Sequence, residues 1–225
     1  MKHKVLVINY TADISGSSVA LFRLLKALPP EVSFLLITPR RSYMARRAEE
    51  QNWNFREVAA PQMVRRLSPL YWLKYGVQSL VFGWKLRREI LRFRPGRLLV
   101  NCSPNIGWII AWPFISREAR PKVLWMVHEL YLEPEWVFSR LRGLIRGYSH
   151  RILCVSHEVR RLFPSTNTRL LPNITLAESE PECRNPFKSG SLNFLWVGTV
   201  SPRKGLHILP ELLISLKDVS IGVKL

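Results

Sequence analysis

The sequence predicts an α/β fold, a Rossmann-like doubly wound parallel sheet, and three observations carry this prediction. Short apolar runs alternate with amphipathic segments of helical length as far as residue 163. Several runs, such as Val-Leu-Val-Ile at residues 5–8, contain no polar residue, as is typical of strands buried on both faces of a parallel sheet. Hydrophobic residues make up 47% of the 225 residues, which is enough for a core. Together these features indicate βαβ units.

The expected elements follow one another in a regular order. The first helix ends at Pro29 and Pro30, because proline cannot donate the hydrogen bond that would continue it. The apolar part of the uncharged window at residues 98–116 is too short to span a bilayer, so we expect a strand, a turn and a buried helix there. The expected strands are residues 5–8, 32–38, 53–58, 98–100, 123–127 and 151–155, and the expected helices are residues 19–28, 41–51, 106–116, 134–147 and 156–163.

A second domain is expected to begin near residue 190. Residues 175–191 are rich in Glu, Ser, Pro and Asn and lack apolar periodicity, which is typical of a surface linker. We therefore expect an acceptor-side domain at residues 1–190 and the start of a second, incomplete domain at residues 191–225. A new apolar strand begins at residue 192, and apolar residues at helical spacing follow it at Leu206, Ile208, Leu209, Leu212, Leu213 and Leu216.

The start of the second domain carries a pattern that suits phosphate binding. An apolar strand at residues 194–197 leads into Gly198, and then Lys204 and Gly205 open the amphipathic helix. A helix N-terminus presents unpaired N–H groups and a partial positive charge, to which Lys204 adds a full charge. A lysine there without an anionic ligand would oppose the helix dipole. We therefore expect Lys204 to contact a phosphate, whereas Arg203 fits this role and a plain surface role about equally.

The charge balance indicates a polyanionic partner. The chain carries 34 Lys and Arg against 16 Asp and Glu, a formal net charge of +18. This suits nucleic acid, anionic lipid headgroups or phosphorylated substrates. Cys102, Cys154 and Cys183 are far apart, so we expect neither a zinc site nor a disulfide framework, and a reducing compartment fits best. The histidines share no metal-ligand spacing, so we expect no metal and no cofactor.

Residues 63–97 form a basic and aromatic segment. Nine of its residues are Lys or Arg and one is acidic, with bulky apolar residues interleaved. This composition is typical of an element that lies on an anionic membrane, but a core helix with a basic solvated face has it too. Gly76 and Gly83 weaken any single long helix here. The candidate membrane-binding residues are Arg65, Arg66, Trp72, Lys74, Phe82, Trp84, Lys85, Arg87 and Arg88.

Short motifs recur in a distinctive order along the chain. They are Asp-Ile-Ser-Gly-Ser-Ser at residues 13–18, Val-His-Glu at 127–129, Cys-Val-Ser-His-Glu-Val at 154–159, Leu-Pro-Asn-Ile at 171–174 and Val-Gly-Thr-Val-Ser-Pro-Arg-Lys-Gly at 197–205. In this order the motifs resemble those of the retaining, GT-B-fold glycosyltransferases of family 4. Thr199 stands where that family commonly has arginine, and Ile174 stands where it has glycine. The chain ends before the family's paired-glutamate element, so we expect a piece of a longer transferase with little activity by itself.

The resemblance implies a nucleotide-diphosphate-sugar donor, a lipid-linked or cell-surface polysaccharide acceptor, and a cytoplasmic location, peripheral on the inner face of the cytoplasmic membrane. It implies retention by front-face substitution, in which cations and N–H groups stabilise the leaving diphosphate. His128 would be the catalytic residue near the transferred sugar, although a histidine at a strand end is more often just half-buried and hydrogen-bonded. The implied donor-binding residues are Gly16, Ser17, Thr199, Arg203 and Lys204.

Two simpler interpretations stay open. Gly16 would let the backbone approach a phosphate or sugar beyond the first strand, but it also fits an ordinary turn before a helix capped by Ser17 or Ser18. The whole chain also fits a basic, non-catalytic α/β module that binds nucleic acid or another polyanion. No nucleic-acid motif is recognised and the basic residues lie beside bulky apolar ones, so we expect no nucleic-acid partner.

Overall fold

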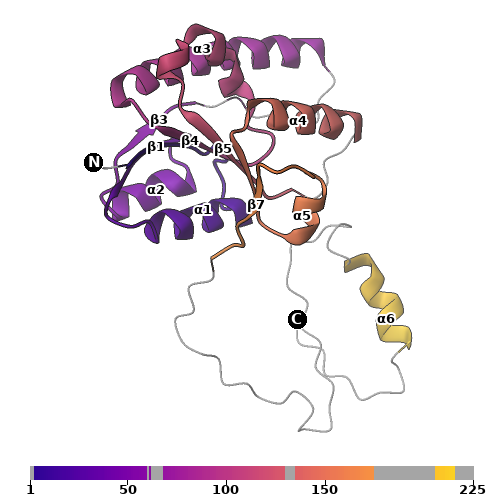
Figure 1. Ribbon diagram of the computed structural model, residues 1–225. Helices are drawn as coiled ribbons and strands as arrows, with labels where there is room; N and C mark the ends of the chain where they lie inside the picture. Colours follow the sequence, from indigo (N-terminus) through magenta and orange to yellow (C-terminus); the bar gives the residue numbers. More distant parts are fainter. Residues whose placement is uncertain (1–2, 60, 62–67, 130–134, 175–205, 216–225) are drawn as a thin grey trace. The chain divides into compact units, whose positions relative to one another are not determined.

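Parallel strands form the sheet of the first unit, as Figure 1 shows. The computed structural model describes residues 3–59, 61, 68–129, 135–174 and 206–215, and the chain divides into two units, Met1–Leu176 and Ala177–Leu225. The sheet has seven strands in the order β3-β2-β1-β4-β5-β6-β7, and every neighbouring pair is parallel. This confirms the predicted fold class. The strands are β1 (His3–Ile8), β2 (Val32–Thr38), β3 (Phe55–Glu57), β4 (Arg97–Asn101), β5 (Lys122–Val127), β6 (Arg151–Cys154) and β7 (Thr168–Leu170).

The strand order creates a switch point between β1 and β4. β1 pairs with β2 on one side and with β4 on the other, so the chain leaves the sheet after β3 and returns beside β1. In open sheets of this kind, ligands bind beyond the carboxyl ends of the strands at such a point. β7 was not predicted, because its Thr-Arg-Leu sequence is too short and polar to show apolar periodicity.

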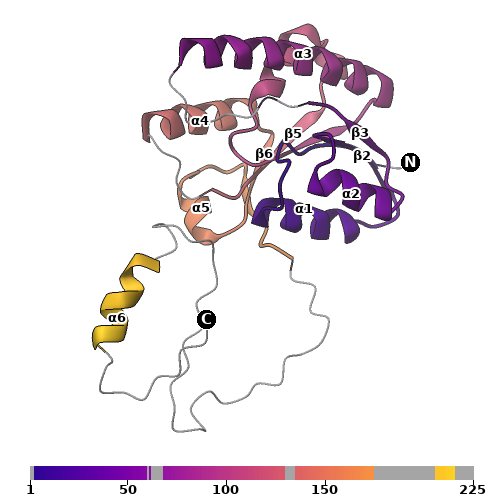
Figure 2. The same cartoon turned by 180° about the vertical axis from the view of Figure 1, so that it is seen from behind.

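Helices cover both faces of the sheet, as Figures 1 and 2 show. On one face, α1 and α2 bury residues such as Leu21 and Met44 against Val7 and Leu36 of the strands. On the other face, α3, η1 and α4 bury a larger cluster. The helices are α1 (Gly16–Lys26), α2 (Tyr43–Glu50), α3 (Pro69–Phe93), α4 (Glu135–Tyr148) and α5 (His157–Arg161), with the 3₁₀ helices η1 (Gly107–Phe114) and η2 (Arg117–Ala119).

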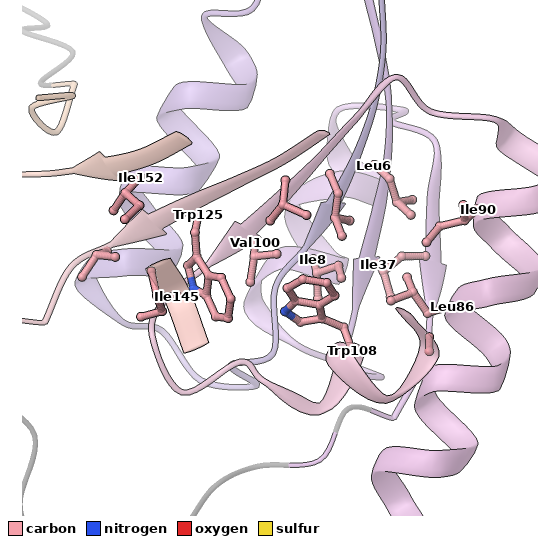
Figure 3. Packing of buried hydrophobic residues seen from close by; sticks show 14 of the residues in the cluster. Leu6, Ile8, Ile37, Leu86, Ile90, Val100, Trp108, Trp125, Ile145 and Ile152 are labelled. Atoms are coloured by element: carbon pink, nitrogen blue, oxygen red, sulfur yellow. The ribbon is translucent and has the colours of Figure 1, made fainter. Parts of the chain in front are cut away.

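Two tryptophans lie in the middle of the larger cluster (Figure 3). Trp108 of η1 and Trp125 of β5 are fully buried, and their ring centroids are 5.4 Å apart. The indole Nε1 of Trp125 donates a hydrogen bond of 3.0 Å to the carbonyl oxygen of Cys102. This bond ties β5 to the loop after β4, and the candidate site is built on that loop.

The helix α3 corrects two expectations about the basic and aromatic segment. It is one continuous helix of 25 residues, although Gly76 and Gly83 lie within it. Packing explains the glycine at position 83, because a Cβ there would lie 3.1 Å from the backbone nitrogen of Ala111 in η1. Phe82 is not a membrane-binding residue, because its side chain faces the sheet in the core and is 0% exposed. Arg65 and Arg66 lie outside the described residues.

The expected helix at residues 106–116 is a 3₁₀ helix. Pro113 lies inside η1 and the tighter 3₁₀ turn accommodates this short, proline-containing segment. Gly107 at its start is required, because a Cβ there would lie 2.5 Å from Cγ of Pro61. Among the described residues, no helix has both the length and the apolar character that crossing a membrane requires.

The described part of the second unit is short. It contains η4 (Leu206–Ile208) and α6 (Leu209–Ser215), in the region where helical spacing was predicted. Ile208, Leu212 and Ile214 of this segment are exposed. The candidate donor-binding residues Thr199, Arg203 and Lys204, and the strand expected at residues 192–197, lie outside the described residues.

Candidate functional site at the carboxyl ends of the strands

Polar side chains follow three neighbouring strands where each strand ends. Asn9 comes directly after β1, Asn101 is the last residue of β4, and His128 comes directly after β5. Nδ2 of Asn101 donates to Oδ1 of Asn9 at 3.0 Å, and Nε2 of His128 lies 2.9 Å from Oδ1 of Asn101. We call these three residues the Asn–His chain. It lies at the switch point between β1 and β4, where ligands bind in such sheets.

The hydrogen bonds determine which nitrogen of His128 carries a proton. Nδ2 of Asn101 also approaches the carbonyl oxygen of Ser17 at 3.5 Å. A carbonyl oxygen can only accept, so the amide nitrogen of Asn101 points toward Asn9 and α1, and its oxygen points toward His128. Nε2 of His128 must then donate to this oxygen. In the neutral ring, Nδ1 is therefore the nitrogen with a free electron pair, ready to accept a hydrogen bond.

Burial keeps this ring neutral. Desolvation lowers the pKa of His128, and the nearby carboxylate of Glu129 opposes this shift with a smaller effect. Oε2 of Glu129 accepts hydrogen bonds from the backbone nitrogens of Ser103 at 3.0 Å and His128 at 3.3 Å. Glu129 therefore joins the loops that follow β4 and β5, and this bracing positions His128.

The loop after β4 has a strained backbone at Cys102. Its φ is 73°, in the left-handed region that costs a residue with a side chain about 1–3 kcal/mol. Three contacts hold the conformation: Cys102 N donates to the Met126 oxygen at 2.9 Å, Trp125 donates to the Cys102 oxygen, and Ser103 N donates to Glu129. Burial raises the pKa of the Cys102 thiol well above its ordinary value, so it is a poor nucleophile at neutral pH.

The start of α1 lies beside the Asn–His chain. Ser15 is the N-cap, and its hydroxyl accepts from the backbone nitrogen of Ser18 at 3.2 Å, so the cap is neither Ser17 nor Ser18 as the turn interpretation suggested. Gly16 is the first helical residue, and among the described residues no atom outside its chain neighbours and its own helix backbone lies within 4 Å of the place a Cβ would take. Packing therefore does not require glycine there. The open backbone at Gly16 and Ser17 is accessible to a ligand at the positive end of the helix.

The structure thus brings Gly16, Ser17 and His128 together. Sequence reasoning missed Asn9 and Asn101, whose signal is a polar residue at the end of an otherwise apolar strand. In the parts of the chain that the structure describes, no three His, Cys, Asp or Glu side chains gather as a metal site would need. What the site offers is a half-buried, oriented acceptor at His128 Nδ1 and the N-terminal N–H groups of α1, whose residue Ser17 contacts Asn101. Such groups suit a sugar hydroxyl and an anion.

Comparison with known proteins relates the fold to glycosyltransferases. No family model and no curated protein matches the chain. The structure of HepE from Anabaena, solved in complex with UDP and glucose, matches with a TM-score of 0.67 and 15% identity, over 97% of this chain and 60% of HepE.

Two further structures match less closely. The lipopolysaccharide outer core galactosyltransferase WaaB matches at a TM-score of 0.54 and 8% identity, over 88% of this chain and 54% of WaaB. MurG from Acinetobacter baumannii matches at 0.51 and 13%, over 98% of this chain and 56% of MurG. At such identities the matches show a shared fold. The chain spans between 54% and 60% of the length of these three proteins.

Proposed function

We propose that this protein is a glycosyltransferase that takes a sugar from a nucleotide-diphosphate donor. The Asn–His chain at the switch point of the sheet is the observation that carries this proposal. It gives His128 one defined tautomer beside a helix start, at the edge where this kind of sheet binds ligands. The fold shared with HepE, which holds UDP and glucose in its structure, supports the same assignment.

Each residue has a role in this proposal. Nδ1 of His128 accepts a hydrogen bond from a hydroxyl of the transferred sugar, and the backbone at Gly16 and Ser17 contacts the donor near its phosphates. Lys204, assisted by Arg203 and Thr199, binds the diphosphate from the second domain and stabilises its charge as it leaves. The motif resemblance to family 4 supports retention of configuration. No side chain then has to act as a covalent nucleophile.

We also propose that the acceptor is lipid-linked or a cell-surface polysaccharide, and that the protein lies on the inner face of the cytoplasmic membrane. The outer side of α3 supports this location. Trp84 is 62% and Trp72 40% exposed, and Lys74, Lys85 and Arg88 are exposed beside them, while Arg87 is half-buried. Apolar side chains among cations suit an interface with anionic lipid.

The test combines binding with turnover. In the full-length protein, we expect UDP-glucose, or another UDP-, GDP- or ADP-sugar from a panel, to shift the ring ¹⁵N resonances of His128. His128→Ala should lower nucleotide release by about 10²–10⁴-fold, the range of a positioned polar group. Asn54→Ala, at an exposed site just before β3 and away from the carboxyl ends of the strands, is the matched control. If no donor perturbs His128, or if His128→Ala keeps full turnover per folded molecule, the proposal fails. The anomeric configuration of the product, read by NMR, tests retention.

A further inference from the structure

The outer side of α3 is apolar, as its inner side is. Leu73, Val77, Leu80 and Trp84 follow one another at intervals of three or four residues, and each is between 54% and 66% exposed. The inner stripe, which contains Phe82, is buried against the sheet. A helix on a soluble surface normally has a polar outer side, and a contiguous apolar patch marks contact with something other than water.

A groove between α3 and η1 opens beside this outer stripe. Its volume is about 380 Å³, within the roughly 300–1,000 Å³ that is typical of small-molecule sites. Phe114, at its η1 side, is 67% exposed. At Gly83 the helix α3 comes close to η1, since a Cβ there would lie 3.1 Å from the backbone nitrogen of Ala111. Six of the seven lining residues are apolar or small, and the seventh is Arg87. The six are Leu80, Gly83, Trp84, Ile110, Ala111 and Phe114.

One cation, Arg87, lines the groove. Nε of Arg87 donates a hydrogen bond of 2.8 Å to the carbonyl oxygen of Phe114, which fixes the guanidinium at the groove. This bond uses Nε alone, and the terminal nitrogens of a guanidinium carry four more N–H donors, which suit a phosphate. Lys85 comes two residues before Arg87 and Arg88 directly after it, and both are exposed. In all, α3 contains five basic residues and one acidic residue.

We propose that this groove takes up an acyl chain of an anionic phospholipid while Arg87 binds the phosphate of its headgroup. The apolar lining matches the acyl chain, and Arg87, together with the other basic residues of α3, matches the charge of the headgroup. This inference rests on the membrane location proposed above and goes beyond it, because a protein that only lies flat on a bilayer needs no groove. A lipid held in this way fixes the height and rotation of the first unit on the membrane.

The experiment uses the full chain and vesicles of phosphatidylglycerol that carries a photoactivatable diazirine within one acyl chain. After flotation and illumination, mass spectrometry maps the labelled residues. We expect labels at Leu80 and Phe114 in the groove. Ile110→Trp fills the groove, and we expect it to lower this labelling about 10-fold while flotation persists, because the displaced chain loses several buried CH₂ groups. Leu73→Trp makes the same kind of change outside the groove and should leave the labelling unchanged.

A separate comparison tests whether Arg87 recognises the phosphate of the headgroup. With diacylglycerol, which has no phosphate, carrying the same diazirine in phosphatidylglycerol vesicles, groove labelling should fall about 10-fold, as expected for a lost charge-assisted pair. Arg87→Gln on labelled phosphatidylglycerol should lower the groove labelling by the same factor. Labels confined to Leu70 and Leu73, or groove labelling that survives Ile110→Trp, would overturn the proposal that the groove holds an acyl chain. The protein would then only lie flat on the bilayer. Absence of flotation, with light scattering that shows a dimer, would overturn both membrane proposals. Glycosyl transfer is judged separately by the His128 experiment, so the failures are distinguishable.

Discussion

Replacing Asn101 by leucine is the sharpest perturbation of the site. Asn101 is 0% exposed and takes part in three hydrogen bonds, with Asn9, Ser17 and His128. Asn101→Leu keeps the branching and the number of heavy atoms of the side chain but removes all three bonds, and its methyl groups exclude any water that could replace them. Oδ1 of Asn9 keeps its bond from the Thr11 hydroxyl at 3.2 Å, whereas Nε2 of His128 loses its acceptor.

The expected loss of stability follows from these bonds. Each contributes about 0.5–1.5 kcal/mol net, so three contribute about 3 kcal/mol to the free energy of unfolding. At about 2–4 °C per kcal/mol for a domain of this size, the melting temperature should fall by about 6–12 °C. Asn54→Leu is the control, because Asn54 is exposed, and it should change the free energy by no more than about 0.5 kcal/mol.

The tautomer of His128 provides a second readout. A general loss of stability, without loss of the Asn101–His128 hydrogen bond, would not change it. Side-chain ¹⁵N spectra of the wild type should show the proton on Nε2. In Asn101→Leu, Nε2–H has no acceptor, so Nδ1–H should become populated. A wild-type ring protonated on Nδ1 would refute the deduction from the hydrogen bonds. So would a variant that melts within about 1 °C of the wild type with an unchanged ring spectrum.

Two other predictions follow from burial. Because the pKa of His128 is lowered in the folded state, the unfolded state binds more protons below its ordinary pKa of about 6.5. The free energy of unfolding should therefore fall as the pH drops from about 6.5 toward the folded pKa, and His128→Gln should flatten this dependence in urea titrations. Phe82→Ala should cost about 3–5 kcal/mol in the same assay. Trp84→Ala, on the exposed side of α3, should cost no more than about 0.5 kcal/mol, and equal losses would contradict the assigned orientation of the helix.

Much of the fold could be predicted from the sequence, because it depends on interactions between residues that are close together in the chain. Strands buried on both faces of a parallel sheet are continuous apolar runs, so β2 was predicted with its observed bounds and β1, β4, β5 and β6 to within two residues. Two helices expected to begin at residues 41 and 156 begin at Tyr43 and His157, where the hydroxyls of the caps Ser42 and Ser156 accept from the first turn. The position of His128 at the end of a strand could also be predicted from the sequence, since His128 directly follows an apolar run.

Other features depend on what each segment packs against. Apolar residues lie all around α3, so periodicity could not tell that Phe82 faces the core and Trp84 does not. Gly76 and Gly83 argued for a break, but packing against η1 at Gly83 makes a continuous helix the better arrangement. The left-handed backbone of Cys102 exists only because Met126, Trp125 and Glu129 hold it, and these contacts come from other strands and loops.

The sequence by itself determined the fold class, most strand positions and the place of His128, because burial and strand length act within a few residues. The tertiary structure alone decided that Asn9 and Asn101, 92 residues apart, form a hydrogen bond, and that Asn101 also contacts His128. That meeting requires the crossover that returns the chain beside β1, so that β1, β4 and β5 become neighbours and their carboxyl ends share one edge. A side chain's partner across a sheet is set by strand order, which is a property of the whole packed unit and of no single segment.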